Sequence, residues 1–179
     1  MSIQIFILSK LIEGNNYPYN IKKRLSEPIP FDELSGLTES KLYYHFDSLV
    51  KQGLVEAIEI IKEEHRPDKQ VFGITEKGRK ELPKKIYKLF EKADGINEML
   101  VGIANIKYVE REKVVEILET KRKNYTEHWN HLKSLEQRMS VDASKEKFMG
   151  FISGYYTTKA DHTIYWLDEL IKRITNEEI

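Results

Sequence analysis

The stretch that decides the fold is Thr38-Glu-Ser-Lys-Leu-Tyr-Tyr-His-Phe-Asp-Ser-Leu-Val-Lys-Gln-Gly53. It opens on a hydroxyl residue that can cap a helix and closes on a glycine that can end one. Its apolar side chains recur at i, i+4, i+7 and i+8, the spacing of one buried helical stripe. They are Leu42, Phe46, Leu49 and Val50. The other face carries polar, basic and aromatic side chains without an acid: Ser40, Lys41, Tyr44, Ser48 and Lys51.

Two β-strands are expected directly after this helix. Leu54-Val-Glu-Ala-Ile-Glu-Ile-Ile61 has the β-branched content of a strand, and Gln70-Val-Phe-Gly-Ile-Thr75 predicts a second one. The polar tip between them is Lys62-Glu-Glu-His-Arg-Pro-Asp-Lys69. A helix followed by a β-hairpin with a basic tip is typical of a winged helix-turn-helix domain that binds DNA.

The rest of the chain is predicted to be helical. Residues 3–12 form a first helix, and Pro18 begins a second one. Thr75 can cap a later helix, which Pro83 should either bend or divide. Residues 110–138 and 145–174 predict two long helices joined by a short turn, which is an antiparallel hairpin.

The predicted fold is therefore mainly α with a small β-hairpin wing. Residues 1–92 would form a winged helix-turn-helix DNA-binding domain, and residues 93–179 a C-terminal α-helical dimerisation domain. The first long helix carries an apolar stripe of Val114, Leu118, Tyr125, Trp129, Leu132, Leu135 and Met139. The second carries Phe148, Ile152, Tyr155, Thr163, Trp166, Leu167, Leu170 and Ile174. Two such stripes leave apolar surface uncovered in a single hairpin, which favours a homodimer.

Composition excludes several classes of function. The 179 residues are 40% apolar, carry no net charge and include no cysteine. DNA affinity would thus need a local basic surface, while thiolate zinc sites and cysteine nucleophiles are excluded. There is no membrane-length apolar run, glycine-rich phosphate loop, nucleophile elbow or distinctive carboxylate pair. We expect a cytoplasmic protein that is not an enzyme and has no cofactor.

Candidate DNA contacts lie on the central helix and at the hairpin tip. Near the helix N-terminus, Ser40 and Lys41 can bind phosphates, while Tyr44 and His45 can reach base edges. Tyr43 is expected to be partly buried. Alternatively, the polar face of the helix could be a solvent-exposed surface with no binding role. The hairpin loop could likewise be charged only because it is exposed to water. In the wing, Arg66 precedes a proline that makes it stiff, which favours a phosphate or minor-groove contact.

The aromatic residues of the C-terminal helices have two interpretations. Trp129 and Trp166 would pack in a core or dimer interface, as aromatic residues commonly do. Alternatively, with Tyr125 and Tyr155, they would line a pocket for a planar effector. A third feature is weaker: His128, His131 and Asp161-His162 could approach a metal ion, but the pattern is not specific and no metal is expected.

The first half of the chain resembles the PadR family of bacterial transcriptional regulators. The residues that carry the resemblance are Leu8…Glu13-Gly14, Tyr19-Asn-Ile-Lys-Lys-Arg24, Ser40-Lys-Leu-Tyr-Tyr-His-Phe46, Gln52-Gly-Leu-Val-Glu56 and Arg66-Pro-Asp-Lys69…Phe72-Gly-Ile-Thr-Glu-Lys-Gly-Arg79. The length and helical hairpin of the second half look like the longer, Vir-type branch. The chain departs from the family at Tyr17-Pro-Tyr19, where many members have His-Gly-Tyr.

The resemblance implies a homodimer that binds palindromic promoter DNA, usually as a repressor, and in many members releases DNA on binding a small aromatic or hydrophobic effector. It places DNA contacts at Ser40, Lys41, Tyr44, Ser48, Arg66 and Lys69. It does not place an effector. The alternative, which the zero net charge favours, is a protein-interaction or ligand-holding module built on a winged-helix scaffold that does not bind DNA.

Overall fold

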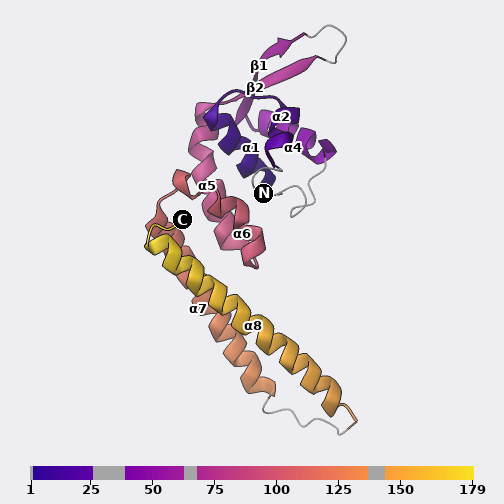
Figure 1. The fold of residues 1–179 in the computed structure, drawn as a ribbon, viewed down its shortest axis with the longest axis vertical. Coiled ribbons are helices and arrows are strands. Elements are labelled where there is room, and N and C mark those ends of the chain that lie inside the picture. Colours follow the sequence, from indigo (N-terminus) through magenta and orange to yellow (C-terminus); the bar gives the residue numbers. More distant parts are fainter. Residues whose placement is uncertain (1, 26–38, 63–67, 137–143) are drawn as a thin grey trace. The chain divides into compact units, whose positions relative to one another are not determined.

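A computed structural model describes residues 2–25, 39–62, 68–136 and 144–179 (Figure 1). The chain divides into two compact units, Met1–Leu89 with Val101–Tyr108, and Phe90–Leu100 with Val109–Ile179. The elements are α1 (Ser2–Glu13), α2 (Pro18–Leu25), α4 (Glu39–Lys51), β1 (Val55–Ile61), β2 (Lys69–Ile74), α5 (Glu76–Lys92), α6 (Ile96–Ile103), a short 3-10 helix (Ile106–Tyr108), α7 (Arg111–Glu136) and α8 (Glu146–Thr175). This confirms the mainly helical winged-helix fold with a C-terminal hairpin. The predicted boundary near residue 92 stays a prediction.

The first unit is a winged helix. Its strands β1 and β2 pair antiparallel from Val55 opposite Ile74 outwards, with a bulge between Ala57 and Glu59 (Figure 1). In the segment before α2, Asn16 forms an isolated antiparallel bridge with Phe72 of β2. There the Asn16 amide donates to the Phe72 carbonyl at 2.9 Å, and the Phe72 amide donates back at 2.8 Å. The wing is thus tied to the start of α2 through backbone hydrogen bonds.

Helix α4 ends as its sequence predicts. Gly53 has a φ of +68°, a conformation that glycine adopts at little cost. Its amide donates to the Val50 carbonyl at 2.8 Å, and the next amide donates to the Leu49 carbonyl at 2.9 Å. These two bonds satisfy carbonyls that the helix end would leave unpaired and turn the chain into β1. The predicted cap at Thr38 lies outside the described residues.

The core of the first unit forms around α1. That helix buries half of its residues, and α4 packs its apolar stripe into the same core. The fully buried side chains include Ile5, Leu8, Leu11, Ile21, Leu42, Phe46, Leu49, Leu82 and Ile86. One predicted member of the stripe is wrong, because Val50 is 40% exposed. It lies 80° around the helix from Leu42 at 100° per residue, at the margin of the buried face.

Helix α5 runs without interruption through Pro83, whose effect the sequence left open. Thr75 caps this helix, since its Oγ1 accepts the Gly78 amide at 3.0 Å and donates to the Gly53 carbonyl at 2.8 Å. Pro83 removes one backbone hydrogen bond. The buried side chains that flank it, Leu82 and Ile86, hold the helix in the core despite that loss.

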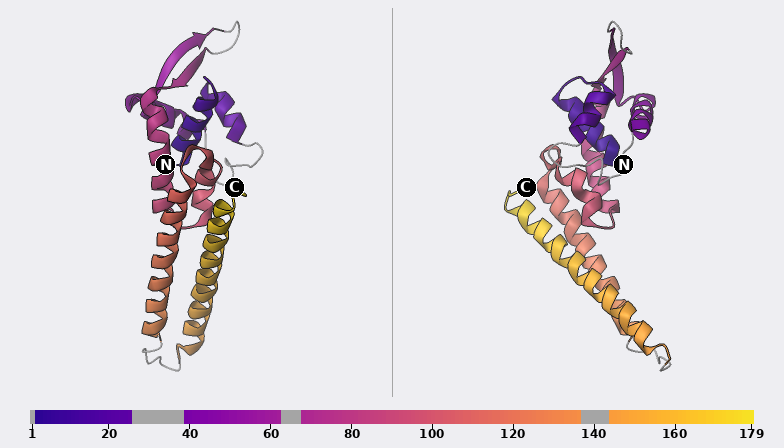
Figure 2. Two further views of the ribbon diagram at one scale, coloured as in Figure 1. Left: turned by 90° about the vertical axis from the view of Figure 1, so that its left-hand side faces the viewer. Right: turned by 45° about the vertical axis from the view of Figure 1, so that its right-hand side comes forward.

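The second unit contains the predicted hairpin of α7 and α8, which run antiparallel and side by side (Figure 2). Apolar side chains are buried where the start of α7 meets the end of α8: Val114, Leu118, Leu167, Leu170 and Ile174. Towards the connection between the helices they become exposed, at Leu132, Leu135, Phe148, Phe151 and Tyr155. Within the described residues, none of the helices is both long and apolar enough to cross a membrane.

Candidate nucleic-acid interface

The outer face of α4 presents polar and aromatic side chains to solvent. Ser40 and Lys41 are exposed in its first turn, and Tyr44 is 69% exposed one turn further. Tyr43 was expected to be partly buried but is also open, at 45%. Since the buried stripe fixes the rotation of α4, these side chains necessarily point away from the core.

Ser48, the last predicted contact on α4, takes part in a network inside the first unit. Its hydroxyl accepts hydrogen bonds from the Gln52 amide group at 3.0 Å and from Gln4 Nε2 at 3.4 Å. Gln4 Oε1 in turn accepts from Lys85 Nζ at 3.0 Å, and burial lowers the pKa of that lysine. The network joins α1, α4 and α5 behind the exposed face, so half-buried Ser48 braces α4 in this structure.

His45 lies at the edge of the same face and is half-buried. Its Nδ1 atom is buried and has no hydrogen-bond partner among the described residues. Burial lowers the pKa of His45 below its usual value, which favours the neutral imidazole at neutral pH. A neutral ring can exchange hydrogen bonds with a base edge, but it offers no positive charge to a phosphate.

At the outer end of the wing, Lys69 pairs with Ile61 at the start of β2, and its ammonium lies 5.3 Å from the centroid of the Tyr17 ring. This cation–π contact directs a basic side chain from the hairpin towards the segment before α2. Arg66, the other predicted wing contact, lies outside the described residues. The hairpin is not uniformly basic, since Glu56, Glu59 and Asp68 are exposed on it.

The comparisons with known proteins fit this geometry. Residues 7–84 match the model of the transcriptional regulator PadR-like family, which spans α1, α2, α4, the wing and the start of α5. The chain belongs to this family. No curated protein matches it.

Several solved structures are similar to this PadR-family chain. A transcriptional regulator from Clostridium thermocellum is 32% identical over 48% of this chain and 78% of its own, with a TM-score of 0.39. Bacillus subtilis PadR in complex with operator DNA is 16% identical over 97% of this chain and 99% of its own, with a TM-score of 0.44. The same regulator in complex with p-coumaric acid is 16% identical over 98% of this chain and 99% of its own, with a TM-score of 0.40.

Helix α2 of this PadR-family chain exposes aromatic and basic side chains that were not among the predicted contacts. Tyr19 is 60% exposed, and Lys23 and Arg24 are exposed in the last turn. Arg24 lies 3.8 Å from Glu13, so part of its charge is already offset. The basic run 22–24 can be seen in the sequence itself. Nothing in the sequence, however, paired Tyr17 with Lys69, which lies 52 positions later.

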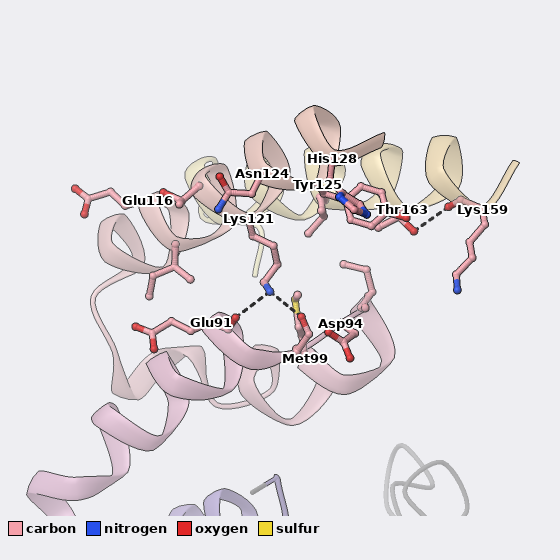
Figure 3. Close-up of a pocket in the computed structure, with 16 residues that line it drawn as sticks. Glu91, Asp94, Met99, Glu116, Lys121, Asn124, Tyr125, His128, Lys159 and Thr163 are labelled. Carbon is pink, nitrogen blue, oxygen red and sulfur yellow. Dashed lines mark hydrogen bonds between the residues drawn. The ribbon is translucent and has the colours of Figure 1, made fainter. Parts of the chain in front are cut away.

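Of the four predicted effector contacts, Tyr125 lines the larger cavity found in the described part of the second unit. This cavity of about 920 Å³ lies between the α5–α6 junction and the two long helices (Figure 3). Tyr125 lines it beside Met99, whereas Trp129, Tyr155 and Trp166 lie elsewhere. From α7, Lys121 donates to the carbonyls of Glu91 at 3.0 Å and Ala93 at 2.7 Å and so caps the end of α5 (Figure 3).

The two tryptophans have separate surroundings in the second unit. Trp129 is half-buried, with the Lys133 ammonium 5.3 Å from its ring centroid. Trp166 is exposed and donates its indole N–H to His162 Nε2 at 3.0 Å. Across the described ranges, no three His, Asp or Glu side chains gather as metal ligands would.

Proposed function

We propose that this PadR-family transcriptional regulator is a cytoplasmic, homodimeric repressor that binds a palindromic operator in double-stranded promoter DNA. Its α4 would enter the major groove, and its β1–β2 wing would follow the adjacent backbone. The protein would act by occupying DNA and not by catalysis. The C-terminal helices would hold the two copies together.

The observation that carries this proposal is the outer face of α4. Lys41 and Tyr44 project from a helix whose rotation is set by Leu42, Phe46 and Leu49 in the core. The network from Ser48 through Gln4 braces that helix from behind. A rigid helix with a lysine in its first turn and aromatic and hydroxyl groups along it suits a groove lined by phosphates.

The charge of the chain determines how such an interface would work. Because the net charge is zero, affinity must come from a few local contacts, which Lys41 and Lys69 would supply together with Arg66. Two copies would double those contacts. In a two-fold dimer the recognition helices would enter successive major grooves, about 34 Å apart, which requires a palindromic site.

A small aromatic or hydrophobic effector would release the DNA by changing the spacing of the two helices. The cavity lined by Tyr125 and Met99 suits such a ligand. The other candidate contacts, Trp129, Tyr155 and Trp166, lie outside that cavity and would each be tested as separate positions. Tryptophan fluorescence of the purified protein during a ligand screen would report on binding near Trp129 or Trp166.

A mobility-shift titration tests the main proposal. The probe is DNA upstream of the protein's own coding region, with unlabelled competitor DNA and two salt concentrations. We expect a specific shift with two chains per site that weakens as salt rises. A folded dimer that gives no shift, or a shift that salt does not affect, contradicts the proposal.

A second candidate function has one observation in its favour. Strand β1 exposes Ile58, Ile60 and Ile61, which a strand that only follows phosphates does not need. These side chains suit a protein partner on the wing, as expected of an interaction module without DNA binding. If that module is the function, Ile60→Ser should abolish partner capture, and Lys41→Glu should have no effect on it.

A further inference from the structure

Helix α8 carries two apolar faces on opposite sides. One face packs against α7 and buries four side chains, Ala160, Leu167, Leu170 and Ile174. The other face, which we call the outer seam, consists of Phe148, Phe151, Tyr155, Thr158, His162 and Tyr165. All six are exposed, and the four large hydrophobic ones are between 55% and 70% exposed.

The spacing of the outer seam indicates which kind of partner it fits. Its members follow one another at intervals of 3, 4, 3, 4 and 3 residues, the a/d pattern of a coiled coil. On a heptad that starts at Phe148, the buried residues occupy positions f and b, on the side of the helix away from the seam. A pattern this regular over five turns fits another helix better than a flat surface or a small ligand.

The surface beside the seam is shaped to let that helix approach closely. Gly150 and Gly154 lie one turn apart, and a Cβ at either position would meet nothing within 4 Å. They line a shallow groove of about 700 Å³ together with Phe151, Tyr155 and Thr158. Two glycines inside a 30-residue helix cost it stability, each by about 1 kcal/mol relative to alanine. A groove that receives side chains from a partner helix explains their presence.

The charges that flank the seam complement each other on a second copy of this chain. Lys147 lies beside one end of the seam and Asp168 beside the other, on the same flank. If two copies of α8 cross antiparallel, each Lys147 meets the other copy's Asp168, whereas a parallel pair sets Lys147 opposite Ile152, which offers it no charge. Asp168 also binds Arg122 at 3.2 Å, and a carboxylate can accept both partners.

From this spacing, groove and charge pattern, we infer that the outer seam of α8 pairs antiparallel with the outer seam of a second copy of the chain. The inference rests on the homodimer of the proposed function and specifies its contact. The two-fold axis lies between Tyr155 and Thr158. Phe148 then packs on Tyr165 of the other copy, Phe151 on His162, and Tyr155 on Thr158.

Sedimentation of the purified protein without DNA tests the seam. Phe151→Asp places a carboxylate at the seam twice per dimer and should raise the dimer dissociation constant on the order of 100-fold. Tyr156→Asp is the matched control, because Tyr156 is an exposed aromatic residue one position off the seam. Circular dichroism verifies that both variants remain helical. A dimer unchanged by Phe151→Asp, or weakened equally by Tyr156→Asp, overturns the assignment.

The orientation is tested by spin-label distances in the intact dimer, since the chain has no cysteine of its own. Labels at Lys159→Cys, near the axis, should lie within about 20 Å of each other, whereas labels at Lys145→Cys should be separated by about 35 Å along the helices. Short distances at both positions would show a parallel pair and refute the antiparallel seam. Long distances at both would show that the copies do not meet through this face of α8.

These outcomes are independent of DNA binding. If the seam is correct and the protein binds no DNA, sedimentation and label distances still come out as expected, and only the mobility shift fails. If the seam is wrong but the regulator function is correct, a salt-sensitive shift persists while Phe151→Asp leaves the dimer intact.

Discussion

The ammonium of Lys69 lies 5.3 Å from the centroid of the Tyr17 ring, which connects the outer end of β2 to the segment before α2. The same two segments are joined by the backbone pair of Asn16 and Phe72. The lysine side chain therefore lies against a ring whose own segment is fixed to β2, and its direction is set before any ligand binds. A preorganised cation loses less side-chain entropy on binding a phosphate than a mobile one.

Removing the Tyr17 ring should weaken operator binding by about two- to fivefold. That range corresponds to an exposed cation–π contact of about 0.5–1 kcal/mol. Tyr17→Leu loses the ring, whereas Tyr17→Phe keeps it and should bind like the parent. Fluorescence anisotropy with labelled operator measures the difference. Equal affinities for all three proteins would show that the contact does not position Lys69 for DNA.

Lys69→Gln should lower affinity similarly on all DNA sequences. It should also reduce the slope of log K against log salt by about one, because one phosphate contact is lost. Titrations at four salt concentrations on specific and random DNA give that slope. A loss confined to the specific site would instead indicate a base contact.

Lys41→Glu should reduce operator affinity at least about tenfold, since it replaces an exposed cation in the first turn of α4 with an anion beside phosphate. Its control is Lys123→Glu on α7, the same charge change in the other unit. Mobility shifts compare the two proteins, and sedimentation confirms that both remain dimers. Undiminished binding by the Lys41 variant would refute the placement of the interface on α4.

Gly78→Ala should destabilise the winged unit by about 3 kcal/mol. A Cβ at residue 78 would lie 2.1 Å from the Leu54 carbonyl oxygen and 2.7 Å from Cγ1 of Ile74, and the backbone oxygen cannot move aside cheaply. Gly95→Ala is the control, because its Cβ would meet nothing within 4 Å. Urea unfolding measures both, and equal midpoints would show that α5 can shift away from Leu54.

Periodicity was sufficient to predict most of the helices and the hairpin. The stripe through Leu42, Phe46 and Leu49 fixes both the existence and the rotation of α4, and Gly53 marks its end. Val50 was misplaced because one residue at the margin of a stripe is not decided by spacing alone. Pro83 could not be resolved locally, since the packing of α5 outweighs the lost hydrogen bond.

Contacts within the candidate site were less predictable than its location. The exposed face of α4 follows from its buried face, so Lys41 and Tyr44 could be selected from sequence. Ser48 could be selected too, but its bonds to Gln4 and Gln52 depend on how α1 packs behind α4. The cavity lined by Tyr125 also needs α5, α6, α7 and α8 in place, which no helical stripe specifies.

Acid should destabilise the winged unit through His45. Burial holds the pKa of His45 below the usual value near 6.5, so as the pH falls below that value the unfolded chain takes up a proton that the folded chain resists. The free energy of unfolding therefore decreases as the pH falls from 6.5 to the lowered pKa of folded His45. Above and below that range, the contribution of His45 to the free energy of unfolding does not change with pH.

The expected result is a lower urea midpoint for the parent protein at pH 5.5 than at pH 7.5, and a smaller decrease for His45→Gln, which cannot titrate. Comparing the two proteins at each pH cancels the titration of the other histidines. Identical decreases in both would show that His45 binds its proton equally well in the folded and unfolded states, and so would contradict the burial of its ring as the cause.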